Sequence, residues 1–322
     1  MTGKALWTVG IGQCELRDEA LPARRAGEAL VRTLWSGLSR GTERLVLNGQ
    51  VPKSEYGRMR APMMAGHFPF PVKYGYAAVG TVEDGPEPLA GRTVFCLHPH
   101  QDRFVAPAAM LAVVPPGLPP RRAVLTANME TALNALWDSG AGPGDRIVVV
   151  GAGVVGLLIA RLSARMPGAE VTVIDVDAHR AGPTQALGLA FCAPEQAPHT
   201  ADVVFHASAS PAGLATAIEA AGLEARVVEV SWYGAGAVPT PLGGAFHSQR
   251  LKLMSTQVGQ VSPTRRPRWD YARRRAKALD LLDDAALDSL ITDEIAFADL
   301  PAALSRLLAA GAPGLQTVIR YA

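Results

Sequence analysis

The sequence predicts an α/β protein in which a doubly wound parallel sheet lies beside a second, β-rich domain. Between about residues 121 and 258, apolar runs of strand length alternate with helical patterns, an order typical of a parallel sheet covered by helices. Residues 1 to about 120 hold short β-like runs that are broken by glycine and proline. The stretch Pro115-Pro116-Gly117-Leu118-Pro119-Pro120 separates the two patterns and therefore marks the edge of a domain.

Each expected element rests on a local pattern. Short uninterrupted apolar runs indicate buried strands of the parallel sheet, and they lie at 147–150, 171–174, 203–205 and 226–230. Helical patterns follow the first strand to about residue 166 and cover 214–221. In the β-rich part, alternating or small-residue runs predict strands at 29–35, 77–82 and 93–97. After residue 259 we expect a basic helical segment, a helix over 301–308 and a last strand over 316–320.

A glycine motif follows the first of the parallel strands. The run at 147–150 leads into Gly151-Ala152-Gly153-Val154-Val155-Gly156, and the second strand ends on Asp175, 19 residues beyond the last glycine. Strand, G-x-G-x-x-G, helix, strand and acid in this order are typical of a dinucleotide site. The glycines allow the tight turn, the approach of a pyrophosphate and close packing of the helix on the sheet. The N–H groups that open the helix, those of Val154 and Val155 among them, would face the phosphates.

Composition and charge fit a cytoplasmic enzyme that acts on a small molecule. The chain has 322 residues, which suggests about two domains. Its net charge is +2 and 19% of its residues are charged, so no global field favours nucleic acid or a membrane surface. No apolar run reaches ~18 residues, and the first residues lack the apolar core of a signal peptide. The 3 cysteines are widely separated, which argues against a disulfide framework and a zinc knuckle.

The order of these patterns resembles the medium-chain dehydrogenase/reductase superfamily of zinc-type alcohol dehydrogenases over essentially the whole chain. Residues 27–37 look like the first-domain strand and active-site turn of that superfamily, and 71–80 match its P-x-x-x-G-H-E-x-x-G stretch. Thr131-Ala132 matches the Thr-Ala at the start of the helix that leads into the nucleotide domain. The resemblance implies a GroES-like catalytic domain over 1–122, a Rossmann dinucleotide-binding domain over 123–258 and a return to the catalytic domain over 259–322.

The departures from that pattern concern the metal. Where the zinc members have a cysteine after the Ser-Gly-x turn, this chain has Ser39, and their His-Glu pair is replaced by Tyr76-Ala77. The remaining cysteine position is Ala127, and the four-cysteine lobe of many relatives is reduced to Cys96. A Zn²⁺ ion needs three N, S or O ligands at about 2.0–2.3 Å. The resemblance, with these replacements, therefore predicts an enzyme without zinc and with no other metal.

Without zinc, hydrogen-bond donors must stabilise a developing oxyanion. The resemblance places Ser39, Thr42 and Tyr76 around the cavity that the metal occupies in relatives, and the Tyr76 phenol can donate to an oxyanion and relay a proton. The alternative is an aromatic side chain that only fills space. Glu43 is a candidate general base or a carboxylate at a helix start. Arg40 aligns with a basic position that contacts the cofactor pyrophosphate in relatives, or it forms a surface salt bridge.

Further cofactor contacts are expected at the carboxyl ends of the parallel strands, where such sheets present their ligands. Ala207 and Ser208 follow the strand at 203–205, while Ser231 and Trp232 follow the strand that ends at residue 230. These residues should border the nicotinamide ribose. The resemblance adds two more cofactor contacts, and these are Thr131 and the segment 257–259.

The acid at the end of the second strand indicates which nicotinamide cofactor is bound. The charge of Asp175 would repel a 2′-phosphate, so NAD is favoured over NADP. Arg161 and Arg180 lie close enough in sequence to keep NADP possible.

Several other polar residues have two interpretations. His98 and His100 have the i, i+2 spacing of a metal pair on a strand, but no third ligand is evident. His67 is either a proton carrier or an exposed loop residue, and Glu130 precedes Thr131 at an expected helix start, where it would act as a cap. The basic run at 265–275 is either a solvated helix face or a docking site for an anionic substrate or an acidic partner.

Residues 36–43 resemble the zinc-lacking branch of the superfamily that includes the bacteriochlorophyllide hydroxyethyl dehydrogenase. The resemblance implies reversible hydride transfer between a nicotinamide cofactor and a secondary alcohol or its ketone, in a homodimer or homotetramer. Two other functions stay open. One is a zinc-free enoyl or quinone reductase, in which hydride goes to a carbon conjugated with a carbonyl. The other is a dinucleotide-binding protein without catalytic activity.

Overall fold

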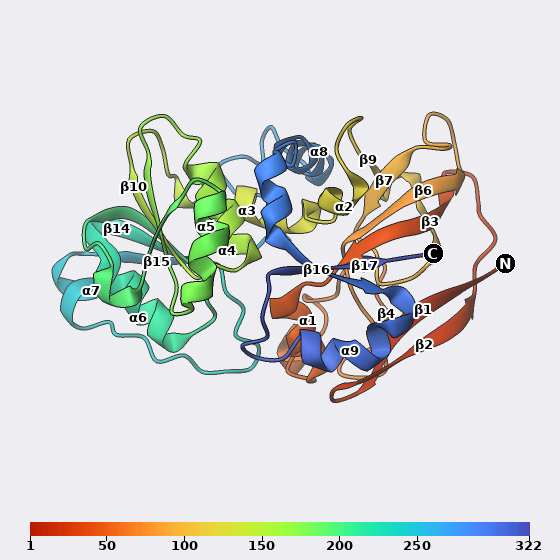
Figure 1. The fold of residues 1–322 in the computed structure, drawn as a ribbon, viewed down its shortest axis with the longest axis horizontal. Coiled ribbons are helices and arrows are strands. Elements are labelled where there is room, and N and C mark those ends of the chain that lie inside the picture. The colour runs from red at the N-terminus through yellow and green to blue at the C-terminus, as the bar shows by residue number, and fades with distance from the viewer. The chain divides into compact units, whose positions relative to one another are not determined.

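The computed structural model describes residues 1–322, and the chain forms two compact units (Figure 1). Unit 1 contains Met1–Ala127 and Arg275–Ala322, and unit 2 contains Asn128–Arg274. The chain passes between the units within two helices, α3 (Thr126–Ser139) and α8 (Tyr271–Leu281). No helix combines the length and the apolar character that a membrane crossing requires.

Unit 2 is built on a six-stranded parallel sheet with the order β12-β11-β10-β13-β14-β15. Its strands are β10 (Arg146–Val150), β11 (Glu170–Ile174), β12 (Ala190–Cys192), β13 (Ala201–His206), β14 (Ala221–Glu229) and β15 (Lys252–Ser255). Val149 of the central strand pairs with Val173 on one side and Phe205 on the other, and all three side chains are fully buried. The predicted doubly wound sheet is confirmed, because uninterrupted apolar runs can be buried on both faces only in such a sheet.

The helices of unit 2 follow the strands as the sequence predicts. They are α4 (Val154–Ser163), α5 (Ala181–Ala186), α6 (Pro211–Ala220) and α7 (Gly244–Ser248). Helix α6 begins after Ser210, whose side chain accepts a hydrogen bond from the Gly213 amide, and Pro211 occupies the first turn, where no amide donor is needed. Its Leu214, Ala217 and Ile218 are buried against the sheet at helical spacing.

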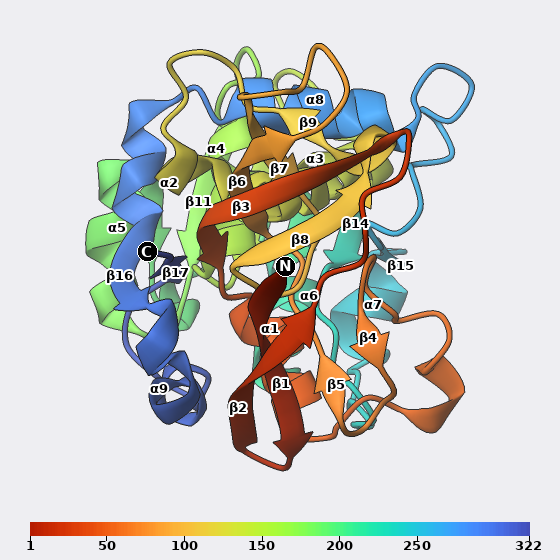
Figure 2. The same ribbon diagram turned by 90° about the vertical axis from the view of Figure 1, so that its right-hand side faces the viewer.

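Unit 1 holds two further sheets (Figure 2). One has the order β16-β17-β3-β6-β7-β9, with β8 also paired to β3, and the other has the order β2-β1-β5-β4. The strands are β1 (Thr2–Gly10), β2 (Gln13–Ala20), β3 (Glu28–Gly37), β4 (Ala65–Gly66), β5 (Val72–Lys73), β6 (Ala78–Asp84), β7 (Thr93–Cys96), β8 (Arg103–Pro107), β9 (Ala112–Val113), β16 (Ile291–Ala296) and β17 (Gln316–Arg320). The helices are α1 (Arg40–Leu47), α2 (Pro120–Ala123) and α9 (Leu300–Leu307).

Short 3₁₀ helices complete the chain at Lys53–Glu55, Ala108–Met110, Ala178–Arg180, Pro194–Gln196, Ala285–Leu290 and Phe297–Asp299.

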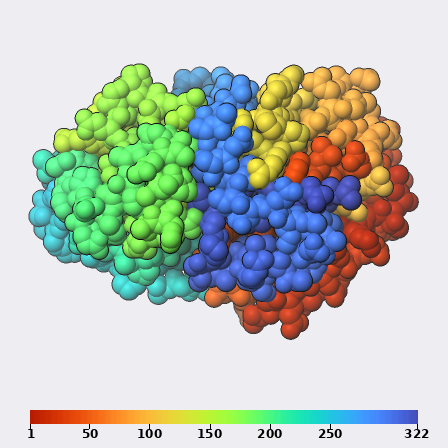
Figure 3. All heavy atoms as spheres, viewed as in Figure 1, coloured from red at the N-terminus to blue at the C-terminus, as the bar shows by residue number.

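Within unit 1 the two ends of the sequence meet, as the adjoining blue and red residues of Figure 3 show. Strand β17 pairs with β3, with Ile319 opposite Ser36. Leu6 of β1 shares a core with Leu304 and Tyr321. The C-terminal segment is therefore an integral part of this unit.

The second domain boundary differs from the prediction. Residues 259–274, expected to return to the catalytic domain, belong to unit 2 because they pack on helix α3. The Ser262 amide donates to Asn134 Oδ1 at 3.2 Å, and the ring centroids of Trp269 and Trp137 lie 4.8 Å apart. The first boundary also lies within α3, so the proline-rich connector ends before the chain leaves unit 1.

Candidate functional site

The glycine turn of unit 2 has the geometry that a bound pyrophosphate requires. Gly151 has φ +108°, and a side chain there would place its Cβ 2.7 Å from the Ser208 amide nitrogen. A Cβ on Gly156 would lie 2.0 Å from the Gly151 carbonyl oxygen, so α4 can start this close to β10 only with glycine at that position. Gly153 is the N-cap of α4, and no side chain caps the helix. The first amides of α4, including those of Val154 and Val155, can therefore donate hydrogen bonds to a bound anion.

Asp175 follows β11 and borders the same turn. Its Oδ2 accepts a hydrogen bond from the Ala152 amide at 2.7 Å, and its Oδ1 accepts one from the Asp177 amide at 2.9 Å. Both oxygens keep lone pairs that a ribose diol can use. The two nearby arginines have partners: Arg180 forms an ion pair with Asp177 at 3.3 Å, and Arg161 donates to the Leu187 carbonyl at 2.9 Å. The residues present therefore fit an adenosine ribose beside Asp175.

A hydrogen-bonded cluster supports the turn after β13. His206, fully buried at the end of that strand, contacts Glu229 Oε2 through Nδ1 at 2.7 Å and Ser208 Oγ through Nε2 at 2.6 Å. Glu229 Oε1 accepts the Ser231 amide at 2.8 Å, and the Tyr233 hydroxyl donates to Glu229 Oε2 at 3.2 Å. Burial, with the adjacent carboxylate, raises the pKa of Tyr233 above its usual range.

Part of this turn was predicted from the sequence. The sequence predicts cofactor contacts for Ala207, Ser208, Ser231 and Trp232, and these contacts stay predictions. It does not predict the His206–Glu229 pair. The available signal was a histidine at the end of an otherwise apolar strand. The Ala207 amide donates to the Val150 carbonyl at 2.8 Å, so the turn is fastened to β10 directly beside Gly151.

In unit 1 the structure brings the three predicted hydroxyl groups together. The Tyr76 hydroxyl donates to Ser39 Oγ, and the Thr42 side chain also hydrogen-bonds the phenol. Burial raises the pKa of Tyr76 to about 12; these two hydrogen bonds oppose the rise and the charge of Glu43 adds to it. The phenol is therefore protonated at neutral pH and can donate to an oxyanion.

Glu43 combines the two roles that the sequence left open. It lies in the first turn of α1, and its Oε1 accepts a hydrogen bond from the amide of the N-cap residue Ser39 at 2.8 Å. Its Oε2 lies 2.9 Å from His100 Nε2. Both side chains are buried, with 6% of Glu43 and 1% of His100 exposed. Helix capping therefore uses one carboxylate oxygen and leaves the other for the histidine.

Beyond His100 the network continues to the C-terminus of the chain. His100 Nδ1 lies 2.8 Å from Ser36 Oγ, which lies 2.9 Å from the Tyr321 hydroxyl. Burial raises the pKa of Tyr321 above its usual range. Gly75 has φ +119°, and a Cβ there would lie 2.9 Å from His100 Cδ2, so the ring needs a glycine beside it. From the sequence His100 was considered only as half of a metal pair, and this role was missed.

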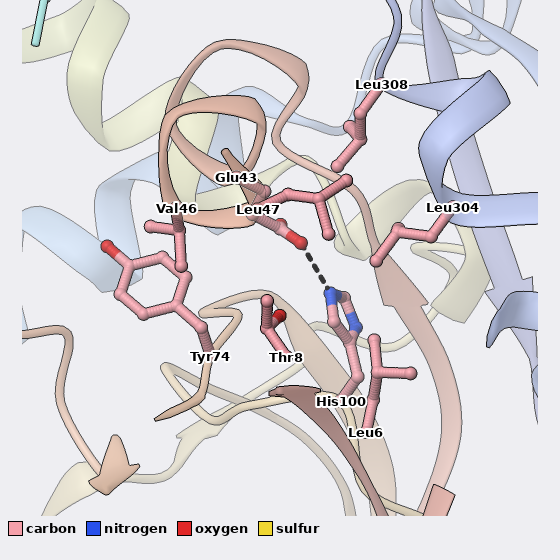
Figure 4. Close-up of a pocket in the computed structure, with 9 residues that line it drawn as sticks. All are labelled: Leu6, Thr8, Glu43, Val46, Leu47, Tyr74, His100, Leu304 and Leu308. Carbon is pink, nitrogen blue, oxygen red and sulfur yellow. Dashed lines mark hydrogen bonds and ion pairs between the residues drawn. The ribbon is translucent and has the colours of Figure 1, made fainter. Parts of the chain in front are cut away.

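A small pocket lies next to the Glu43–His100 pair (Figure 4). Its polar lining comes from Thr8, Glu43, Tyr74 and His100, and its apolar lining comes from Leu6, Val46, Leu47, Leu304 and Leu308. The empty space is about 270 Å³ and is partly open to solvent. In Figure 4 the carboxylate and the imidazole meet across this space, while the two leucines of the C-terminal region face them.

The residues at the expected metal position do not suit Zn²⁺. Ser39 and Tyr76 hydrogen-bond each other, and the third ligand position is occupied by Ala127, whose side chain is a methyl group. No group of three or more His, Cys, Asp or Glu side chains is arranged to hold a metal ion. His98 does not join His100: it stacks on Phe104 with 3.7 Å between ring centroids. Neutral hydroxyl groups that already bond each other are a poor donor set for zinc.

The remaining predicted residues have local roles. Arg40 donates to the Ala312 and Gly314 carbonyls, both at 2.6 Å, and its contact with a cofactor stays a prediction. The expected helix start at Thr131 is wrong, because α3 begins at Thr126. Glu130 is therefore not a cap: its side chain lies on a buried helix face, where it pairs with Arg274 at 3.1 Å.

The basic run and His67 are also placed. Arg274 is buried, while Arg273 lies over the Trp269 ring at 4.1 Å, so the run is not a uniformly solvated helix face. The first arginines of the run, at 265–268, lie in turns, because α8 begins only at Tyr271. His67 is exposed in a loop, the second of its two interpretations.

Comparison with known proteins identifies the fold. No family model matches the chain. L-idonate 5-dehydrogenase of Escherichia coli K-12 superposes with a TM-score of 0.81 at 14% identity, covering 99% of this chain and 98% of its own. A short chain alcohol dehydrogenase of Escherichia coli CFT073 complexed with NADH gives 0.78 at 16% identity, and a Sinorhizobium meliloti 1021 protein with NADP bound gives 0.79 at 17%, each with 99% of both chains covered. The chain thus has the medium-chain dehydrogenase fold.

Proposed function

We propose that this protein is a zinc-independent, nicotinamide-dependent oxidoreductase that transfers hydride between its cofactor and a secondary alcohol or the corresponding ketone. The observation that carries the proposal is the uncapped start of α4 beside Asp175, within a turn where Gly151 and Gly156 have no room for side chains. Solved structures with this fold and NADH or NADP bound support a nicotinamide cofactor.

The hydroxyl set of unit 1 supplies the polar chemistry. A nicotinamide nucleotide, when bound, accepts or donates the hydride at its ring carbon C4. The Tyr76 phenol, protonated because of its raised pKa, donates a hydrogen bond to the substrate oxygen and stabilises negative charge there. Without substrate, the phenol donates its one hydrogen to Ser39 Oγ. When substrate binds, the phenol turns this hydrogen to the substrate oxygen, and the Ser39 and Thr42 hydroxyls can then donate to the phenol oxygen. Three hydroxyl groups thus take over the polarising role of the metal in zinc enzymes.

NAD is the expected cofactor. A carboxylate at Asp175 favours a ribose diol and repels a 2′-phosphate, and the nearest arginines are already bonded to Asp177 and to the Leu187 carbonyl. A catalytic efficiency with NADP⁺ equal to or above that with NAD⁺ would overturn this part of the proposal. Asp175→Ser should move the preference toward NADP⁺ by roughly fivefold, since the repulsion between two unit charges in water is worth about 1 kcal/mol.

The proposal is tested with protein that has been treated with a chelator and mixed with NAD⁺ and a panel of secondary alcohols. We expect NADH to appear at a rate that added Zn²⁺ does not raise. A single tightly bound equivalent of Zn²⁺ that restores lost activity would refute zinc independence. Reduction of enones without any alcohol oxidation would identify an enoyl or quinone reductase. Tight NADH binding without turnover of any substrate would identify a nucleotide-binding protein that is not an enzyme.

A further inference from the structure

Alcohol oxidation releases a proton, and the hydroxyl groups that contact the substrate cannot store it. Burial raises the pKa of Tyr76 to about 12, and the pKa values of Tyr74 and Tyr321 are raised for the same reason, so all three phenols stay protonated near neutral pH. Serine and threonine hydroxyls are weaker acids still. A proton that leaves the substrate must therefore move through this hydroxyl set to another group.

The carboxylate of Glu43 is adjacent to that set. The Ser39 hydroxyl accepts the hydrogen bond from Tyr76, and the Ser39 amide donates to Glu43 Oε1 at 2.8 Å. The amide holds the carboxylate next to Ser39 but carries no proton, so the transfer to Glu43 needs the Ser39 hydroxyl to turn toward the carboxylate or one water molecule between them. The charge of Glu43 acts on the Tyr76 phenol, which shows that the two are electrostatically coupled. Glu43 Oε2 is in turn bonded to His100, and an imidazole can take up a proton at one ring nitrogen and release one from the other.

The pocket connects this pair to water. Glu43 and His100 both line it, and its empty space of about 270 Å³ is partly open to solvent. That space includes the open solvent at the mouth of the pocket, and the room next to the pair is about that of a single water molecule. Figure 4 shows that neither Leu304 nor Leu308 comes between the carboxylate and the ring. The pocket is built entirely from unit 1 residues.

We propose that Glu43 and His100 carry the substrate proton from the Ser39–Tyr76 hydroxyl pair to water in the pocket between β1, α1 and α9. The inference rests on the proposed function. In the oxidation, the C–H bond breaks and its electron pair leaves as hydride to the nicotinamide, while the O–H bond breaks and its proton passes through the two hydroxyls to the Glu43 carboxylate. The Glu43–His100 pair then holds one extra proton and releases it to a pocket water. Ketone reduction runs the same steps in reverse.

Other groups around the pair set its surroundings. The titratable or charged side chains that act on it or on its partners are Tyr74, Tyr76, Tyr321, His98, Lys73 and Asp102. Lys73 is bonded to Glu19 at 2.6 Å and His98 to its own neighbour's carbonyl, so neither is hydrogen-bonded to the pair. Ser36 Oγ lies 2.8 Å from His100 Nδ1, on the side of the ring away from Glu43. This contact holds the ring with Nε2 toward Glu43.

The test compares His100→Gln, His100→Ala and Glu43→Gln with native protein. Glutamine at 100 can keep a hydrogen bond to Glu43 but cannot carry a proton, and Glu43→Gln keeps the acceptor that caps α1. We expect the alcohol-oxidation kcat of each variant to fall roughly 10- to 100-fold near neutral pH, less than the roughly 100- to 10,000-fold of a group that exchanges a proton with the substrate directly. NADH affinity stays unchanged. Added imidazole restores His100→Ala in a saturable manner, more strongly at higher pH, because its free base is the active form.

His98→Gln is the matched control, because His98 is a buried histidine two residues away that is outside the network. It should keep the native kcat and its pH profile. A second readout needs no turnover: in cofactor-free protein labelled with ¹⁵N-histidine, the ring N–H of His100 exchanges with water faster than that of His98.

The outcomes separate the two proposals. Native protein that oxidises no alcohol with NAD⁺ overturns the proposed function and the proton route with it. Active native protein whose His100→Gln and Glu43→Gln variants keep the native kcat overturns the route alone. A His100 ring as protected from water as His98, or a folded His100→Ala variant that imidazole does not restore, overturns it as well. If a His100 variant fails to fold, Glu43→Gln and the exchange measurement on native protein decide.

Discussion

Each unit of this chain contains a buried histidine that meets a glutamate with one ring nitrogen and a serine with the other. In unit 1, His100 contacts Glu43 through Nε2 and Ser36 through Nδ1. In unit 2 the ring is reversed, and His206 contacts Glu229 through Nδ1. A tyrosine hydroxyl adjoins each set. The same residue types are thus used twice in one molecule.

Their surroundings give the two clusters different tasks. The unit 1 pair lines a pocket that is partly open to solvent and lies beside the hydroxyl groups of Tyr76 and Ser39. The unit 2 pair instead contacts Ser208, in the turn that packs against Gly151. A Cβ on Gly213 of α6 would lie 2.1 Å from Ser208 Oγ, so the Ser208 hydroxyl is held against that helix. We infer that the first cluster moves protons and that the second fixes the shape of a cofactor loop.

The largest effect is expected at the glycine turn that the second cluster supports. Gly156→Ala places a methyl group 2.0 Å from the Gly151 carbonyl oxygen, a backbone atom that can move only with the turn. We expect NADH affinity, measured by fluorescence titration, to fall more than roughly 100-fold, with a lower melting temperature. Gly153→Ala is the control for packing, since a Cβ there would have no heavy atom within 4 Å. It should keep the melting temperature, and a native NADH affinity in both variants would contradict the assigned cofactor site.

The next effect concerns the hydroxyl set of unit 1. Tyr76→Phe removes the donor to the substrate oxygen, and loss of one such donor costs about 100- to 1,000-fold in kcat. NADH affinity should not change, because the loss lies in unit 1. The phenol pKa of about 12 adds a pH expectation: ketone reduction by native protein should show no loss from tyrosine ionisation until the pH approaches that value. An unchanged kcat in Tyr76→Phe would reduce the tyrosine to a space-filling role.

A smaller effect sharpens the comparison between the clusters directly. His206→Gln should weaken NADH binding by roughly tenfold, about 1.4 kcal/mol, the size of one hydrogen bond to a positioned group. At saturating cofactor its kcat should stay close to native. His100→Gln is expected to show the opposite division, with kcat lowered and affinity kept. Equal changes of both parameters in both variants would show that the two clusters do not have separate tasks.

The sequence predicted the parts of the molecule that depend on local pattern. The strands over 147–150 and 171–174 are uninterrupted apolar runs, and such runs have few other uses in a soluble α/β protein. The strand over 316–320 was predicted with its observed bounds. The hairpin of β1 and β2 was not predicted, because β2 has few apolar residues and none of its residues is fully buried, so its sequence gives a weak signal.

The two histidine clusters lay beyond this reasoning for a physical reason. Glu43 and His100 are 57 positions apart, and His206 and Glu229 are 23 apart, so only the folded sheets bring each pair together. Ser39, Thr42 and Tyr76 could be grouped in advance only through resemblance to a known active-site turn. The compact unit extends past residue 259 for a similar reason, because the contacts of Trp269 and Arg274 with α3 leave no local pattern in the sequence.

An effect on stability rather than on activity comes from the third buried histidine, which has no acidic partner. His98 bonds a backbone carbonyl and stacks on Phe104, and burial lowers its pKa to about 3, with nearby Lys73 and His100 adding to the shift. The unfolded chain therefore binds a proton at this residue below about pH 6.5 while the folded chain does not. The free energy of unfolding should fall as the pH drops from about 6.5 toward 3, by about 1.4 kcal/mol per pH unit.

His98→Gln removes this one dependence, and its urea unfolding should vary less with pH than that of native protein over the same range. His100 and His206 are each hydrogen-bonded to a glutamate, whereas His98 is bonded to a backbone carbonyl. If His98→Gln keeps the native pH dependence, the acid sensitivity of the fold arises elsewhere. The distinction between paired and unpaired buried histidines would then have no bearing on stability.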